Sequence, residues 1–414
     1  MGNCSKLNKS KKNKIIMDCI TEEMNNDIVF TRYLYLKDEV KIALLTNILQ
    51  KKEDAIFWAY ELYYSGFKEE FFQFIWKIYY DFFATLNPNF EIYLIKKQKE
   101  WKSGENENDI IKDKIISTIV QDLIIRPFNT DVFILRKLSD LMEFKINMLE
   151  NINLNNDDDD IMRQIIYWIK KDDYRSMTEY IINNQSETVW LYNIILDCFE
   201  ACHCKINKTK LIKQFIVAKK HINYKIMLLA KIIQLFSVKN MLKEGKKIYI
   251  KVEPEEIIPY ETIEACLGLK PYRILKIACL YSTNENNHLH LFKLARDDIP
   301  NIKDLYNNND EWLYYASFSP IWFERIIDNH GFINYSKKRI EFENEEDCEY
   351  FNTKYDLEPD EQTTNVKNKC IPIIQNEVID TRIDFNYFYE NYKNNGFIQL
   401  SKDELLLLNN KIIY

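Results

Sequence analysis

Four residues near the middle of the chain have the side chains of a metal site. Cys198, Cys202, His203 and Cys204 lie close together in the sequence, and thiolate sulfur and imidazole nitrogen are donors that structural zinc sites use. Such a site needs four ligands and commonly takes them as two spaced pairs, whereas no second pair lies near this group. Because cysteine also packs in helical cores as a small apolar side chain, core packing is the favoured interpretation and metal binding is the alternative.

Two further groups contain side chains that metal enzymes use. His288 and His290 place two imidazoles close together, without a cysteine or carboxylate at a metal-binding spacing. The sequence EPDEQ at 358–362 carries the Pro-Asp of PD-(D/E)xK nucleases, but Arg382 stands where the downstream part of that motif needs lysine. Ten acidic residues lie between 341 and 362, against Lys354 alone. Such a run favours a solvated surface, or a docking face for a basic partner, over a nuclease site.

The scarcity of glycine argues against several classes of enzyme. The chain has seven glycines, none close to another, whereas dinucleotide fingerprints, P-loops and kinase glycine-rich loops need clustered glycine so that the backbone can approach phosphate. The sequence also lacks the G-x-S-x-G pattern of hydrolases and the H-E-x-x-H pattern of zinc proteases. We therefore assign no catalytic residue and no cofactor, and the sequence favours a protein that is not an enzyme.

The first fourteen residues contain the parts of a membrane anchor. Residues 1–14 include Gly2, Cys4 and five lysines, without an acidic residue. N-myristoylation takes glycine at position 2 with serine or threonine at the sixth position, and here Ser5 is one place out of register. Acylation of Gly2 or Cys4 next to a basic patch would bind a membrane stably. A solvated basic arm is the favoured interpretation, and lipidation is the alternative.

Length and composition place the chain among globular proteins. Of 414 residues, 46% are hydrophobic and 29% are charged, a balance well away from that of disordered sequences. The net charge of −7 argues against nucleic acid as a partner of the whole chain. Nine cysteines without a regular framework indicate free thiols in a reducing compartment. Since we find neither a signal peptide nor a long apolar stretch, we expect a cytoplasmic protein that is not secreted.

The periodicity of apolar residues predicts a mainly α fold of antiparallel helical hairpins, solenoid- or bundle-like, with a small α+β part at the C-terminus. Gly66 suits a helix end that needs positive φ. Asn87-Pro88 and Ser319-Pro320 are typical helix starts, the first opening a helix to about Trp101. Further helices are expected at 161–184, 187–204, 208–220, 222–242, 260–281 and 288–296. Strands are expected at 247–252, 332–335 and 339–342.

Polar loops suggest a division of the chain into parts. The polar run at 151–160 is the best internal boundary. The predicted parts are a flexible basic arm at 1–30, a helical domain at 31–150, a second helical domain at 161–330 and an acidic mixed α/β part at 331–414. Aromatic residues recur at helical spacing among acidic neighbours, which favours core packing over the stacking of single-stranded bases.

Four aromatic or acidic segments resemble segments of a protein family. They are WAYELYYSGF at 58–67, WKIYYDFFATLNP at 76–88, WLYYASFSPIW at 312–322 and EPDEQ at 358–362. They are similar to segments in uncharacterised proteins of nucleocytoplasmic large DNA viruses, mimivirus relatives among them, and the similarity covers roughly residues 35–365. The resemblance implies a viral protein made in the cytoplasm of an infected host. No activity comes with that family, so it implies no functional residues.

Two functional hypotheses follow from these patterns. The first is a non-enzymatic helical scaffold or adaptor that binds other proteins and is held at a membrane through residues 1–14 if these are acylated. The second is a metal-dependent or nucleic-acid-processing enzyme, whose site would be built from scattered acids or from the cluster Cys198–Cys204. The first is favoured, because the amphipathic helices can present a protein-binding face whereas no catalytic motif is present.

Overall fold

The computed structural model describes residues 29–103, 109–142, 144–150, 152, 158–184, 186–219, 224–240, 242–261, 292, 311–355 and 385–411. In these ranges the chain is mainly helical, with one two-stranded antiparallel sheet in its C-terminal part. The predicted fold class is therefore confirmed. None of the described helices combines the length and the apolar character that a membrane crossing requires.

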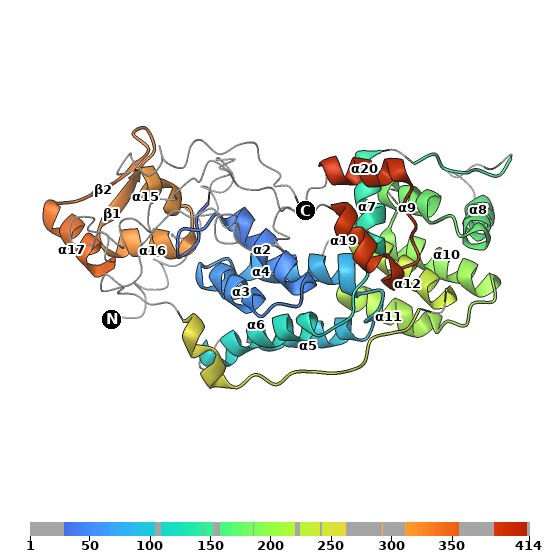
Figure 1. Cartoon of the computed structure of the whole chain (residues 1–414), viewed down its shortest axis with the longest axis horizontal. Helices are drawn as coiled ribbons and strands as arrows, with labels where there is room; N and C mark the ends of the chain where they lie inside the picture. Colours follow the sequence, from blue (N-terminus) through green and yellow to red (C-terminus); the bar gives the residue numbers. More distant parts are fainter. Residues whose placement is uncertain are drawn as a thin grey trace.

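The first helices form hairpins in the middle of the molecule (Figure 1). They are α2 (Lys37–Leu49), α3 (Asp54–Tyr64), α4 (Lys68–Ile78), η1 (Tyr79–Phe83), α5 (Phe90–Ser103), α6 (Asp109–Ile124) and α7 (Asp131–Leu141). Gly66 follows α3 with a φ of +94°, as its position predicted. The segment η1 is a π-helical turn that continues α4, and it places two polar side chains, Tyr80 and Asp81, inside the core.

The predicted start of α5 is wrong by a few residues. Asn87 does not cap α5, which begins at Phe90. Its side-chain amide donates instead to the carbonyl oxygens of Phe83 (3.0 Å) and Pro127 (2.8 Å). The asparagine therefore closes the preceding helical segment and joins it to the segment before α7.

The next helices follow the predicted ranges closely. They are α8 (Asp158–Lys171), α9 (Tyr174–Asn183), α10 (Thr188–Ala201), α11 (Lys208–Ala218) and α12 (Tyr224–Lys239). The expected range 161–184 is broken by Asp172, whose φ is +52°, and the side chain of Asp173 then accepts from the backbone N–H of Ser176 to begin α9. Side chains at the starts of α10 and α11 make the same kind of cap, which satisfies N–H groups that a helix start leaves unpaired.

The predicted strand at 247–252 is wrong. This segment has no regular secondary structure and pairs with no strand in the described part of the chain. Two side chains in α6 and just after it bind its backbone: Arg126 donates to the carbonyl oxygen of Ile248 (2.6 Å), and Asp122 accepts from the N–H of Ile250 (3.0 Å). The alternation of the sequence therefore reflects an irregular segment that is held against the end of a helix.

The C-terminal elements fall into two sets. One set holds α15 (Glu311–Ala316), α16 (Pro320–Asp328), β1 (Gly331–Asn334), β2 (Arg339–Phe342) and α17 (Glu345–Tyr355), and the other holds α19 (Phe385–Tyr392) and α20 (Lys402–Lys411). The two short strands agree with the prediction to within one residue and pair Ile333 with Ile340. Ser319 caps α16 and Pro320 is its first residue, also as predicted. Short 3-10 turns lie at Pro254–Glu256, Ile258–Tyr260 and Lys393–Asn395.

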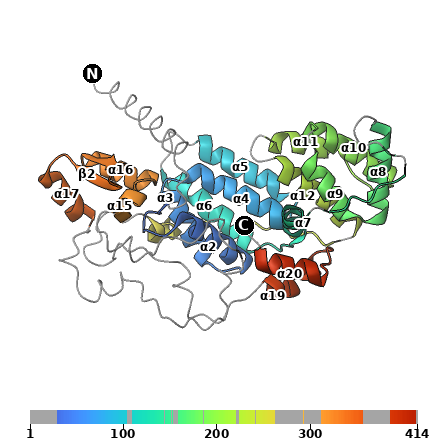
Figure 2. The ribbon, with the colours of Figure 1, turned by 90° about the horizontal axis from the view of Figure 1, so that it is seen from above.

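Two hydrophobic cores hold these elements together. The main core contains side chains from α2 to α12 together with α19 and α20, so it includes residues from both sides of the polar run at 151–160. The second core joins Phe30, Leu34 and Leu36 to α15, α16, β2 and α17. The expected C-terminal part at 331–414 thus contributes to both cores, and Figure 2 shows α17 and α20 far apart, with α2 between them.

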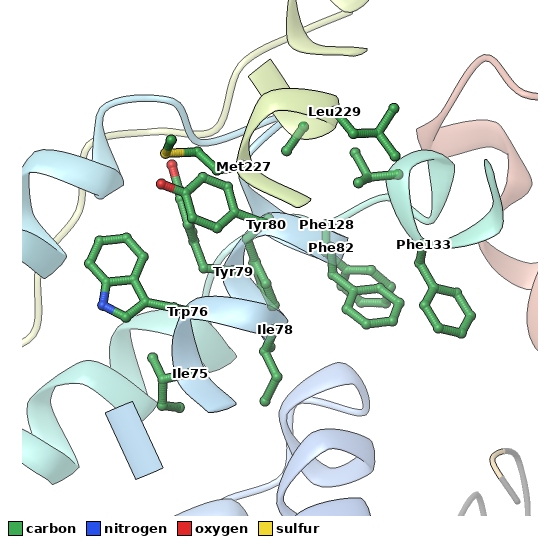
Figure 3. Close-up of a cluster of buried hydrophobic side chains, with 14 of the residues drawn as sticks. Ile75, Trp76, Ile78, Tyr79, Tyr80, Phe82, Phe128, Phe133, Met227 and Leu229 are labelled. Atoms are coloured by element: carbon green, nitrogen blue, oxygen red, sulfur yellow. The ribbon is translucent and has the colours of Figure 1, made fainter. Parts of the chain in front are cut away.

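Aromatic side chains fill the main core, as their spacing predicted. Trp58, Trp76 and Trp168 are all at most 2% exposed. Figure 3 shows the ring of Tyr80 in η1 next to Met227 of α12, and the rings of Phe82 and Phe128 beside each other. Because tryptophan, tyrosine and phenylalanine bury a large area each, these rings hold the helices at fixed distances from one another.

Candidate functional site

A groove runs between α5 and α11 on the surface of the molecule. It has a volume of about 590 Å³, and Figure 2 shows α11 near one end of α5. The α5 side is lined by Glu91, Ile92, Ile95, Lys96, Lys99, Glu100 and Ser103, and the α11 side by Lys213, Gln214 and Val217. Because the α5 positions recur at intervals of about one helical turn, they form one continuous face along that helix.

The floor of the groove is apolar because each helix buries a different face. Helix α5 turns Phe90 and Leu94 into the main core, which leaves Ile92 51% exposed. Helix α11 packs on α10 through Phe215, whose ring stacks on Tyr192 at 4.5 Å. Val217 remains 43% exposed. Two apolar side chains on neighbouring helices therefore face solvent with no described element covering them.

A buried polar network fixes the base of the groove. Glu91, which is 1% exposed, accepts from Lys231 of α12 (2.6 Å) and from the hydroxyl of Tyr80 in η1 (2.7 Å). Burial raises the pKa of Tyr80 well above its ordinary value, so this hydroxyl stays protonated and donates. The network ties α5 to two other elements of the main core, and it leaves Glu91 engaged with structural partners.

Lysines form the rim of the groove. Lys96 is 72% exposed and lies 3.8 Å from Glu100, whose carboxylate is held more closely by Lys97 at 2.8 Å. Lys99 and Lys213 have no acidic partner within 4.0 Å among the residues that the structure describes. The rim is thus positively charged on both sides, although the chain as a whole carries a net charge of −7.

A second surface pocket lies where α20 packs near α9. It has a volume of about 700 Å³ and contains Arg175 and Glu404. The guanidinium group of Arg175 donates to both carboxylate oxygens of Glu404, at 2.7 and 2.9 Å. Because these charges already satisfy each other, this pocket offers less to a ligand than the groove between α5 and α11.

The predicted cysteine cluster does not converge on a common point. Cys198 is buried in α10, where its thiol donates to the carbonyl oxygen of Met162 at 3.6 Å. Burial raises the pKa of this thiol to about 12, so the thiol is protonated at neutral pH. Cys202 and Cys204 are half-buried, and His203 is exposed with a φ of +61°. No three of Cys198, Cys202, His203 and Cys204 bring their ligand atoms within 4.8 Å of one another.

Another group of potential metal ligands was not expected from the sequence. His330, Glu343 and Asp347 have ligand atoms within 4.8 Å of one another, and His330 Nδ1 lies 3.2 Å from a carboxylate oxygen of Asp347. His330 follows α16, Glu343 follows β2 and Asp347 lies in the first turn of α17, so only folding brings them together. The imidazole is 62% exposed, and the observed contact is that of a histidine–aspartate pair.

The remaining sequence candidates lie outside the described residues. These are Gly2 and Cys4 within residues 1–14, His288, His290, the segment EPDEQ at 358–362, and Arg382. The groove was not predicted from the sequence, because its two sides are more than a hundred residues apart. The available signal was the apolar pair Ile216-Val217, which follows Phe215 directly and so widens the apolar face of that helix.

Comparison with protein-family models, curated proteins and solved structures finds no match to this chain. The resemblance to viral proteins therefore stays a prediction.

Proposed function

We propose that the protein is a non-enzymatic helical scaffold that binds another protein through the groove between α5 and α11. The observation that supports the proposal most directly is the exposed apolar floor formed by Ile92 and Val217. Grooves between packed helices are a recurrent docking place for protein segments. The buried pair Glu91–Lys231 holds one wall of the groove in a fixed position, and a preformed site loses less entropy on binding.

The chemistry of the lining also favours binding over catalysis. General acid–base or nucleophilic catalysis needs a titratable group that can reach a substrate. Here Glu91 is enclosed by Lys231 and Tyr80, and Glu100 is paired with Lys97. Neither cysteine nor histidine occurs among the residues that line the groove.

The test replaces the apolar floor and follows the partners of the full chain. In the variant Ile92→Asp/Val217→Asp, we expect the set of co-purified or proximity-labelled proteins to lose specific members. The matched control is Ile258→Asp, because Ile258 is 60% exposed and lies outside the groove. An identical set of partners for the floor variant and the wild-type chain would contradict the proposal.

The proposal includes a membrane tether through residues 1–14 and a viral origin, with the cytoplasm of the infected host as its location. The tether is tested by the intact mass of the N-terminal peptide from cells. Loss of Met1 with an acyl group on Gly2, or an acyl group on Cys4, would support the tether. An N-terminal peptide that carries no acyl group on either residue would exclude it.

A metal-dependent enzyme is the second candidate function, and one observation favours it. The ligand atoms of His330, Glu343 and Asp347 lie close enough to share one cation, and imidazole with carboxylates is a common donor set. A stoichiometric metal in the purified chain that is lost in His330→Gln/Glu343→Gln would support this candidate. Full retention of that metal in the variant would exclude this site.

A further inference from the structure

We propose that the occupant of the groove between α5 and α11 is an amphipathic helix of a partner protein, with acidic side chains on both of its flanks. This inference rests on the proposed function, because it names the chemistry of the segment that the groove would bind.

The length of the lining matches a helical segment. On α5 it extends from Glu91 to Ser103, and at 1.5 Å per residue these positions span about 18 Å, which is about three helical turns. Side chains of α5 and of one turn of α11 bound this groove, and the ridge of a third helix can settle into a groove between helices. A third helix would cover Ile92 and Val217 with one apolar stripe.

An extended peptide fits this groove less well. Binding by strand addition draws its affinity from unpaired backbone groups at the edge of a sheet. Both walls here are helices, whose backbone N–H and C=O groups are used within the helix except at its ends. The lining therefore offers side chains, and a helical ligand satisfies its own backbone.

The rim selects the charge of that ligand. Lys96 and Lys99 lie on the α5 side, and Lys213 lies on the α11 side. Lysine stems can cover apolar surface while their ammonium groups remain in water, where they can meet carboxylates on both flanks of a bound helix. A basic helix would place like charges against all three lysines, and such juxtaposition disfavours a wrong partner.

The first experiment measures binding of designed peptides to the full chain by fluorescence anisotropy. The peptides share one helical length and one leucine stripe, and they differ in having Glu, Gln or Lys on both flanks. We expect the Glu peptide to bind best and the Lys peptide worst, with a difference of about tenfold at low salt that shrinks as salt is added.

A charge swap provides the decisive variant. In Lys96→Glu/Lys99→Glu/Lys213→Glu, the order of the Glu and Lys peptides should reverse, which a folding defect would not produce. The matched control Lys51→Glu/Lys171→Glu/Lys205→Glu changes three exposed lysines outside the groove and should keep the original order.

The outcomes separate this inference from the proposed function. If all peptides bind with equal affinity and Ile92→Asp/Val217→Asp abolishes their binding, the inference of an acidic helix is overturned. The groove would then still be a docking site. Binding that the floor variant leaves unchanged would overturn both. Two further outcomes would show that the inference is wrong. If the chain does not bind the Glu peptide but sediments with phosphatidylserine vesicles through the same lysines, the occupant is a lipid surface. If the chain does not bind the Glu peptide but forms a dimer that the floor variant disrupts, the occupant is a second copy of the chain.

Discussion

Asp131, at the start of α7, makes the stability of the protein depend on pH in a way that can be calculated. Its side chain is 1% exposed and accepts from the backbone N–H groups of Phe397 and Ile398, both at 3.2 Å. These bonds attach the segment between α19 and α20 to the main core. Burial nevertheless raises the pKa of Asp131 from 3.8 to about 6, because removing the charged carboxylate from water costs more than the two N–H bonds return.

The sign of the effect follows from the direction of the pKa change. A carboxyl group whose pKa is higher in the folded state stabilises the fold when it is protonated in both states, below about pH 4. This contribution is lost as the pH rises through the folded value of about 6. At about 1.36 kcal/mol per pKa unit, the difference between 3.8 and about 6 amounts to ~3 kcal/mol of unfolding free energy for Asp131.

The perturbation is Asp131→Asn, which keeps the shape of the side chain and removes its titration. The assay is urea unfolding of both proteins at intervals between pH 4 and pH 7.5. Relative to the variant, the wild-type protein should lose unfolding free energy as the pH rises from about 4 to about 6, and the difference should level off above that value. The comparison concerns the slope, because asparagine also replaces one acceptor oxygen by an amide group and lowers stability at every pH.

A control separates burial from the mere loss of a carboxylate. Asp403→Asn removes an exposed acid from the first turn of α20 in the same part of the fold, and it should change stability by no more than ~0.5 kcal/mol. If the curves for wild type and Asp131→Asn run parallel from pH 4 to pH 7.5, the carboxyl group does not titrate as argued, and the reasoning from burial is refuted.

Three other predictions concern the core. Arg136→Met should lower the unfolding free energy in urea by ~3–5 kcal/mol, because it leaves the fully buried carboxylate of Asp81 without its bidentate partner; an effect below 1 kcal/mol would contradict this. In the native protein iodoacetamide should modify Cys202 before Cys198, because burial raises the pKa of the Cys198 thiol to about 12. Peptide mass spectrometry would show the order of modification, and equal rates for the two cysteines would disprove the prediction. Gly66→Ala should lower the unfolding free energy by ~1–3 kcal/mol, because the φ of Gly66 is +94° and an added Cβ would lie 2.4 Å from the ring of Pro320 at the start of α16. An unchanged urea midpoint would contradict this prediction.

Local signals explain which parts of the fold were predictable. The helix expected at 187–204 is observed as Thr188–Ala201, and the start at Ser319-Pro320 is correct. Apolar periodicity and helix caps are properties of neighbouring residues, so the sequence contains them directly. The strand expected at 247–252 failed because a strand needs a pairing partner, and its partners turned out to be the side chains of Asp122 and Arg126.

The candidate site depends on contacts that no local pattern contains. The run Lys96-Lys97-Gln98-Lys99 is that of an ordinary solvated helix face, and Gln98 in fact turns inward to accept from the indole N–H of Trp76 at 2.9 Å. Only the approach of α11 converts the outer face of α5 into one wall of a groove. The potential metal ligands show the same dependence on the fold. No three of Cys198, Cys202, His203 and Cys204 gather their ligand atoms although they are close in sequence, whereas His330 and Asp347 lie seventeen residues apart and are in contact.

Buried ion pairs explain how this helical body can hold such a groove in one shape. Arg32–Glu61, Arg136–Asp81 and Lys231–Glu91 each join segments far apart in the sequence. A buried pair adds little net stability over apolar side chains of similar size, since burial removes both charges from water. It does penalise any arrangement that separates the charges. The pair Lys231–Glu91 lies at the base of the groove, so the fold resists movement of α5 at the position where a bound helix would press against it.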